Sequence, residues 1–133
     1  MKPTSVMADK KRVLIVDDEV AVGNMLAACC DLWGMEPMVA TTGAEALQLI
    51  EDSLPDLIVT DFMMPGMTGH EFCRRARANR RLQGVPVILT SSAPEAARRD
   101  SPADVLIPKP FDLDEVEKIV REWMARSLGR ERG

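Results

Sequence analysis

Tyrosine is absent from this sequence, and aromatic residues make up only 4% of its 133 residues. Surfaces that bind nucleic acids usually combine basic side chains with aromatic ones, and the net charge of −4 also argues against such a surface. No apolar run approaches the ~20 residues that a membrane-spanning helix needs, and residues 1–12 are too polar for a secretory signal. We therefore expect neither a nucleic acid nor a membrane as a direct partner.

Cysteine is also scarce. The three cysteines are odd in number, Cys29 and Cys30 are adjacent, and no spacing fits a disulfide framework or a zinc site. We expect reduced thiols in the core of a cytoplasmic protein. Apolar residues (46%) and charged residues (29%) occur in the proportions of an ordinary globular domain. We expect one domain over residues 11–128, a flexible N-terminal segment at 1–10 and a polar tail at 129–133.

Short apolar runs alternate with helix-like stretches along the chain. Most of the runs are continuously apolar, as in strands that are covered on both faces. Two of the helix-like stretches begin with a capping box, Thr42 with Glu45 and Thr68 with Glu71. This order predicts an α/β fold in which a parallel sheet carries helices on both faces. The expected strands lie within residues 12–17, 36–41, 56–61, 85–91 and 104–108.

The fourth helix is expected to be short. Residues 92–104 barely exceed the ~10–12 residues that a crossover between parallel strands requires. Pro94 and Pro102 bracket this segment and leave room for at most two helical turns. Its apolar residues are mainly alanines, so burial contributes little to hold the helix against the sheet. We therefore predict a short or poorly ordered fourth helix.

Polar residues gather at the carboxyl ends of the expected strands, where functional sites of open parallel sheets lie. Two carboxylates ~4 Å apart repel each other by ~4 kcal/mol at an effective dielectric constant of 20, so three carboxylates need more than one lysine to compensate them. An oxygen cluster of this kind suits Mg²⁺. The residues are Asp17, Asp18, Asp61, Ser91 with its neighbours Thr90 and Ser92, and Lys109.

This cluster could support phosphoryl transfer to a carboxylate. Asp61 would be the nucleophile, Lys109 would neutralise charge, and one of the hydroxyls that follow the fourth strand would bond a phosphoryl oxygen. Taken singly, Asp18 would be a helix cap, Asp61 a turn residue and Lys109 a surface lysine. Their joint placement on successive strand ends favours the functional interpretation.

The motifs LIVDDE, DLIVTDFMMPGMTG, PVILTSS and IPKPF, in this order, resemble those of the receiver domain of two-component response regulators. The resemblance covers almost the whole chain. It implies a flavodoxin-like (βα)5 three-layer sandwich whose five-stranded parallel sheet has the order 2-1-3-4-5. It also implies Mg²⁺ as the cofactor, with Asp18 and Asp61 as direct ligands, Asp17 acting through water and Met63 through its backbone carbonyl.

The same resemblance implies a regulatory switch rather than an enzyme. Asp61 would accept a phosphoryl group from a histidine kinase or a histidine phosphotransfer protein, and the domain would promote this transfer and a slow autodephosphorylation. Ser91 falls on the family's switch hydroxyl, and Lys109 on its lysine before a cis proline. The chain would be a stand-alone regulator, similar to those of chemotaxis, or part of a longer regulator or hybrid kinase that signals to another protein.

The sequence departs from the family at a few positions. Leu106 replaces the usual aromatic switch residue, and Met63 and Ala93 offer no polar group to orient an attacking water molecule. Strand alternation places Thr90 and Ser91 on opposite faces, although the assignment of the hydroxyl stays open by one position. His70 is expected to face solvent. The arginines of the third helix form a solvated face or a docking patch for an acidic partner; they are Arg74, Arg75, Arg77, Arg80 and Arg81.

The sequence argues against two other functions and leaves a third open. A phosphatase of the haloacid-dehalogenase type needs a second aspartate two residues after its nucleophile, where Met63 lies. A flavodoxin-like flavin carrier needs a hydroxyl- or glycine-rich phosphate loop after the first strand, where this chain has acidic residues. A receiver-like interaction domain that works without phosphorylation remains as the alternative.

Overall fold

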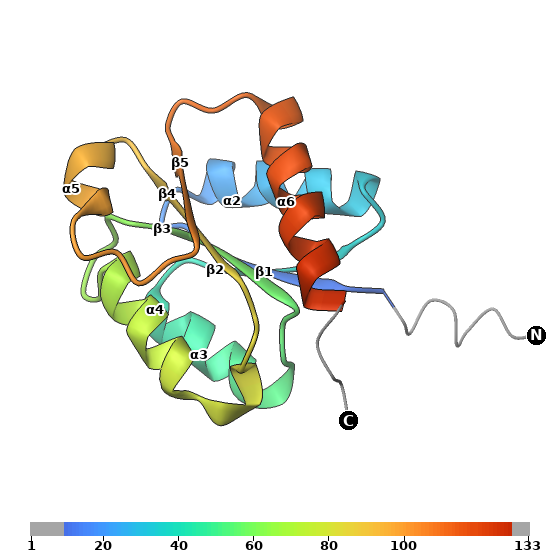
Figure 1. The fold of residues 1–133 in the computed structure, drawn as a ribbon, viewed down its shortest axis with the longest axis horizontal. Coiled ribbons are helices and arrows are strands. Elements are labelled where there is room, and N and C mark those ends of the chain that lie inside the picture. The colour runs from blue at the N-terminus through green and yellow to red at the C-terminus, as the bar shows by residue number, and fades with distance from the viewer. Residues whose placement is uncertain (1–9, 129–133) are drawn as a thin grey trace, which may run out of the picture.

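Strands and helices alternate throughout residues 10–128, the part of the chain that the computed structural model describes (Figure 1). Apart from Lys10, the segments 1–10 and 129–133, predicted to be flexible and polar, lie outside these residues. The strands are β1 (Arg12–Val16), β2 (Glu36–Ala40), β3 (Leu57–Asp61), β4 (Val87–Ser91) and β5 (Val105–Pro108). The helices are α2 (Val20–Leu32), α3 (Gly43–Asp52), α4 (Gly69–Ala78), α5 (Pro94–Arg98) and α6 (Leu113–Leu128), with a short 3-10 turn η1 (Arg80–Leu82) after α4.

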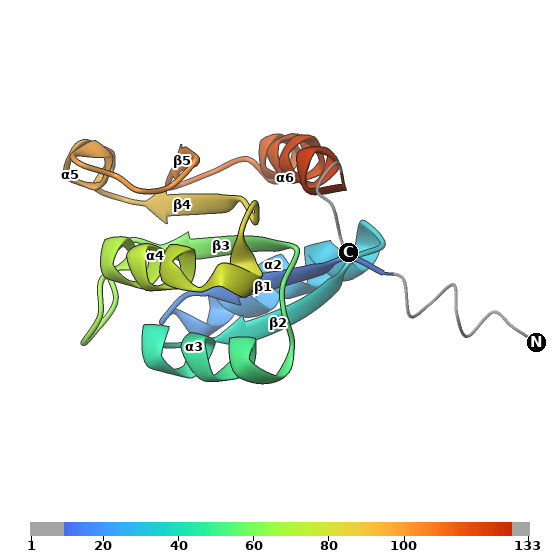
Figure 2. The same ribbon diagram turned by 60° about the horizontal axis from the view of Figure 1, so that its bottom comes forward.

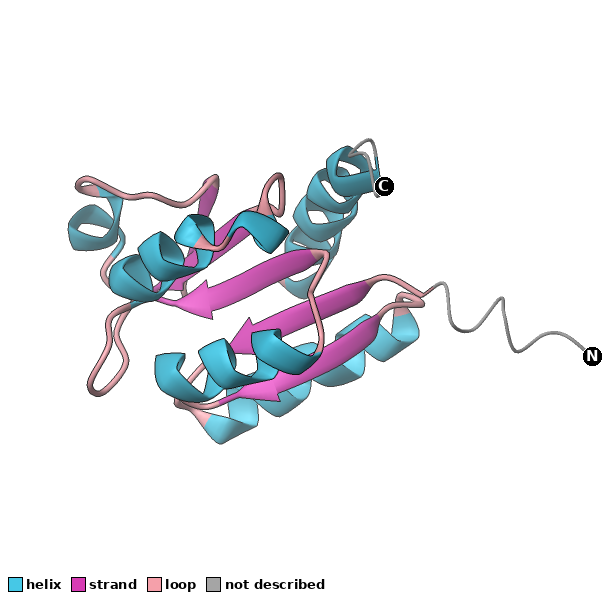
Figure 3. Ribbon diagram, turned by 90° about the horizontal axis from the view of Figure 1, so that it is seen from below, coloured by secondary structure: helices cyan, strands magenta, loops and turns pink. Residues whose placement is uncertain are grey.

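The five strands form one parallel sheet of order β2-β1-β3-β4-β5. Helices α3 and α4 cover one face, and α2 and α6 cover the other, so that three layers result (Figures 1 and 3). The predicted α/β class, the strand order and the flavodoxin-like three-layer architecture are therefore confirmed.

The core consists of two apolar clusters, one on each face of the sheet. Alternate residues of β1 point to opposite clusters: Leu14 packs with α3 and α4, whereas Val13 and Ile15 pack with α2 and α6. Strands β3 and β4 are buried along their whole length. Burial on both faces explains why these strands appear in the sequence as continuous apolar runs.

The helix starts follow the predicted capping signals. The Thr42 hydroxyl accepts a hydrogen bond from the backbone N–H of Glu45 at 3.0 Å, and Thr68 accepts one from Glu71 at 3.1 Å. Each bond satisfies one of the backbone donors that the first helical turn leaves without an intrahelical acceptor.

The three cysteines are free and buried, as predicted. Burial, together with the neighbouring Cys29 and Asp31, raises the pKa of the Cys30 thiol to about 12, so it stays protonated at neutral pH. Within residues 10–128, no helix has both the length and the apolar character that crossing a membrane requires.

Helix α5 is short, as predicted, with five residues from Pro94 to Arg98. It lies beside α4 at the same end of the molecule (Figures 1 and 2). The prediction that His70 faces solvent is wrong: the residue is only 8% exposed, and its Nε2 lies 2.7 Å from the carbonyl oxygen of Ala97 in α5. Arg77, also on α4, donates to the carbonyl of Pro102 at 2.8 Å and pairs with Asp104. The other arginines of this region are exposed, as expected for a solvated face.

Candidate functional site

The predicted site residues meet at one edge of the sheet, where the parallel strands end. Asp17 follows β1, Asp61 ends β3, Ser91 ends β4, and Lys109 follows β5. The two aspartates are 2% and 7% exposed, so their charges lie largely out of water. Burying an unpaired carboxylate in this environment would cost free energy. The partners of the two aspartates therefore decide whether their charges can be kept.

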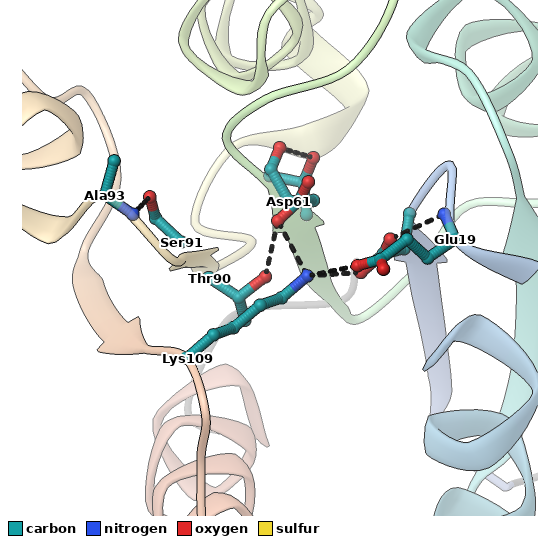
Figure 4. Close-up of polar contacts among 8 residues, drawn as sticks. Glu19, Asp61, Thr90, Ser91, Ala93 and Lys109 are labelled. Atoms are coloured by element: carbon teal, nitrogen blue, oxygen red, sulfur yellow. Dashed lines mark hydrogen bonds and ion pairs between the residues drawn. The ribbon is translucent and has the colours of Figure 1, made fainter. Parts of the chain in front are cut away.

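Lys109 is the common partner (Figure 4). Its ammonium nitrogen lies 3.0 Å from Oδ1 of Asp61 and 3.1 Å from Oδ2 of Asp17. Glu19, at 3.5 Å, is a third anionic neighbour. Glu19 was not singled out from the sequence, although it is the third acidic residue of the LIVDDE motif. One ammonium group thus faces three carboxylates.

Asp17, Asp18 and Asp61 form the acidic cluster, in which one carboxylate oxygen of each lies within 4.8 Å of the others. Asp17 is held from a second side, because its Oδ1 accepts a hydrogen bond from the backbone N–H of Glu19 at 2.9 Å. Asp18 is exposed at the mouth of the site. Three converging hard oxygen donors with one exposed member fit Mg²⁺, which binds through few carboxylates and keeps several waters.

Charge and burial oppose each other in this cluster. Burial raises the pKa of the Asp61 carboxyl above its usual range; Lys109 lowers it by hydrogen bonding and charge, whereas Asp17 and Asp18 raise it further. Burial alone would lower the pKa of Lys109, but hydrogen bonds to Asp61 and Asp17 raise it above its ordinary value. The lysine is therefore firmly charged, while the charge on Asp61 is incompletely compensated. A divalent cation would supply the missing positive charge.

Two hydroxyls of β4 make different contacts, as strand alternation requires. The Thr90 hydroxyl lies 3.4 Å from Oδ1 of Asp61, which is long for a hydrogen bond between oxygens. The Ser91 hydroxyl instead accepts a hydrogen bond from the backbone N–H of Ala93 at 2.8 Å (Figure 4). In this conformation Thr90 is the hydroxyl that contacts Asp61, and the predicted role of Ser91, a hydrogen bond to a phosphoryl oxygen, stays a prediction.

The site opens into a polar cavity of about 320 Å³. An apolar pocket of about 350 Å³ adjoins it and shares the residues Ser92 and Lys109. The exposed side chain of Met63 lines the polar cavity. The other residues of the polar cavity are Asp18, Glu19, Asp61 and Ser91, and those of the apolar pocket are Val22, Met25, Pro110 and Phe111.

Comparison with known proteins agrees with the resemblance to receiver domains. A family model described as the response regulator receiver domain matches residues 13–121. The chain is 33% identical over 125 residues to the response regulator Rre1 of Synechocystis sp., an alignment that covers 90% of this chain and 54% of that protein. The chain spans about half the length of the curated relatives it matches.

Solved structures agree with this assignment. A putative response regulator from Chloroflexus aurantiacus is 30% identical with a TM-score of 0.80, and the alignment covers 88% of this chain and 99% of that one. The response regulator TrrA of Thermotoga maritima, solved in complex with Mg²⁺ and BeF, is 30% identical with a TM-score of 0.77, over 85% of this chain and 98% of that one. The match of the family model over most of the chain, together with the strand order, shows that this protein belongs to the receiver-domain family of two-component response regulators.

Proposed function

We propose that the domain is a phosphoacceptor switch in which Asp61 takes a phosphoryl group from a histidine kinase or a histidine phosphotransfer protein. The observation that carries the proposal is the buried Asp61 carboxylate, which shares Lys109 with Asp17 and lies within 4.8 Å of two other carboxylates. The relative TrrA was solved with Mg²⁺ and BeF, and the acidic cluster has the donor atoms for the same cation.

The geometry suggests how the carboxylate is used. Lys109 and Thr90 both contact Oδ1 of Asp61, so Oδ2 is the oxygen available for attack. In the transfer, the bond between Oδ2 and phosphorus forms while the bond between phosphorus and the donor's imidazole nitrogen breaks. The imidazole leaves with the electron pair and takes up a proton from solvent. Lys109 stays charged throughout and stabilises the added negative charge.

Mg²⁺ would be held by Asp18 and Asp61 directly, by Asp17 through water and by the backbone carbonyl of Met63. When bound, it would neutralise carboxylate and phosphoryl charge. The exposed Asp18 and the largely buried Asp17 suit these different roles, because a ligand at the mouth can follow the cation more freely than one fixed by Lys109 and the Glu19 backbone.

A protein donor of the phosphoryl group is supported by the apolar pocket beside Lys109. Its lining residues include Met25, which is 38% exposed, and the nearby Val20 is 59% exposed. Exposed apolar side chains next to a charged site favour docking of an apolar surface from a partner. Free, buried cysteines support a cytoplasmic location. The strands and helices, which run from Arg12 to Leu128, support a domain spanning residues 11–128.

Incubation with acetyl phosphate and Mg²⁺, followed by intact-mass measurement, tests the proposal. The wild-type protein should gain the mass of one phosphoryl group, and Asp61→Asn should gain none. Asp31→Asn, which removes an exposed aspartate of α2, is the matched control and should behave like the wild type. If the wild type gains no mass from either acetyl phosphate or a phosphorylated histidine kinase, the phosphorylation-independent interaction domain becomes the better interpretation.

A further inference from the structure

Helix α5 is too short to be stabilised by its own backbone hydrogen bonds. In a helix of five residues, almost every backbone carbonyl lacks an N–H donor within the helix, and the carbonyl of Ala97 lies in the last turn. Ala97 is fully buried, so water does not compensate this carbonyl. His70 Nε2, at 2.7 Å, is its hydrogen-bond donor. Because a carbonyl oxygen only accepts, the proton must lie on Nε2.

His70 packs on Phe62, the residue next to Asp61, whose backbone is held by hydrogen bonds. Its ring lies 4.7 Å from the ring of Phe62, the residue that follows Asp61. The backbone of Phe62 is fixed in both directions, by its own N–H to Thr90 and by the N–H of Gly69 to its carbonyl. A Cβ atom at Gly69 would collide with the backbone of Asp61 and lie 2.9 Å from Cα of Phe62. The start of α4 therefore packs directly on Asp61 and Phe62, which we call the phosphoacceptor loop.

Helix α5 is therefore tied to the site at both ends. At its N-terminal end, the backbone N–H of Ala93 donates to the hydroxyl of Ser91 at 2.8 Å. At its C-terminal end, the carbonyl of Ala97 accepts from His70. The serine lies at the tip of β4 and lines the cavity of Asp61, whereas the histidine is shielded from solvent and does not line that cavity.

We propose that His70 is a positioning residue that anchors the C-terminal end of α5 to the phosphoacceptor loop, so that α5 pivots about Ala97 when Ser91 releases Ala93. The pivoting step rests on the proposed function, because it requires a phosphoryl group on Asp61 to attract the Ser91 hydroxyl. The anchoring by His70 does not depend on phosphorylation and can be measured in the unmodified protein.

The test compares amide hydrogen exchange at Ala97 in the wild type and in variants. The N–H of Ala97 donates to the carbonyl of Ala93, the residue that precedes α5. His70→Leu keeps an apolar side chain but removes the donor, and exchange at Ala97 should become at least about fivefold faster, as expected for the loss of one hydrogen bond. His70→Gln restores a donor and should return exchange toward the wild-type rate. Arg77→Gln is the matched control, because it removes a bond from the same helix to Pro102, beyond α5.

Phosphorylation with acetyl phosphate supplies the second part of the test, with its extent read from the intact mass. In the phosphorylated wild type, Ala97 should stay protected while the amide of Ala93 exchanges faster; in phosphorylated His70→Leu, both should lose protection. Equal exchange at Ala97 in unmodified wild type and folded His70→Leu would overturn the anchoring role. Protection of Ala93 that is unchanged by a confirmed phosphorylation would overturn the pivot. Failure of the wild type to gain mass would count against the proposed function alone, because the comparison of unmodified proteins would still decide the anchoring.

Discussion

Replacing Asp61 by asparagine should make the protein more stable in the absence of Mg²⁺, although it removes a residue of the site. The variant keeps the shape of the side chain and an oxygen that can accept from Lys109, but it loses the buried negative charge. Burial, the largest influence on this carboxyl, raises its pKa, which means that the fold favours the neutral form. An uncharged amide at this position should therefore destabilise the folded state less than the carboxylate does.

The distances set the size of this effect. At an effective dielectric constant of 20, the 3.0 Å contact with Lys109 is worth about 5.5 kcal/mol. The buried Asp17 lies within 4.8 Å of Asp61, so its repulsion costs at least about 3.5 kcal/mol, and that of Asp18, which water screens, costs less. Attraction and repulsion nearly cancel, and the cost of burying the charge remains. We expect Asp61→Asn to raise the free energy of unfolding by about 1–2 kcal/mol at pH 7.

Urea unfolding followed by tryptophan fluorescence, at low salt and with EDTA, measures the difference. Because the folded pKa of Asp61 lies above its ordinary value of 3.8, the folded state binds more protons than the unfolded state as the pH rises from that value through the folded pKa. The wild type therefore loses stability over this window, and the advantage of the variant should vanish below it. Adding Mg²⁺ should stabilise the wild type more than the variant. A variant less stable than the wild type at pH 7, or a difference that persists on acidification, would refute this reasoning.

Three further outcomes are expected. Asp18→Ala should lower the affinity for Mg²⁺ at least about tenfold, because the cluster loses one of its few carboxylates; equal affinities by calorimetry would contradict this. Met63→Asn and Ala93→Glu should each speed the loss of the phosphoryl group about tenfold by orienting water; a mass-spectrometric decay no faster than that of the wild type would show that another factor sets the lifetime. Thr42→Ala should lower the free energy of unfolding by about 1 kcal/mol through loss of its cap, and an unchanged urea midpoint would mean that the cap contributes nothing.

The fold and the position of the site follow from local features of the sequence. Continuous apolar runs predict buried parallel strands, and the residues at their ends need only the common direction of those strands to be brought together. For this reason the sequence alone predicts that Asp17, Asp61 and Lys109 lie at one edge of the sheet. The capping residues Thr42 and Thr68 were equally accessible, because a cap depends on a few neighbouring residues.

Contacts that depend on side-chain direction could not be predicted in the same way. Whether Thr90 or Ser91 contacts Asp61 is decided by the pleat at the end of β4 and by the backbone N–H of Ala93, which competes for the Ser91 hydroxyl. The burial of His70 depends on the carbonyl of Ala97, 27 positions away in the sequence. Every residue has a backbone carbonyl, so the sequence does not indicate which one a histidine will contact. The second position of a helix that begins in an exposed loop predicts solvent exposure, and only the neighbouring α5 reverses that expectation.

These missed contacts change how α5 should be understood. Alanine-rich composition predicts a helix that is loosely held, and apolar burial of five residues is indeed small. A hydrogen bond compensates for this small burial: His70 donates to the carbonyl of Ala97 in α5. Arg77 instead binds the segment that follows α5, at Pro102 and Asp104. Leu106 on β5 carries no polar group and can follow α5 only through packing. In this chain the directional contacts between the site and α5 therefore come from α4 and the end of β4. A substitution at His70 should consequently change the response of α5 more than one at Leu106.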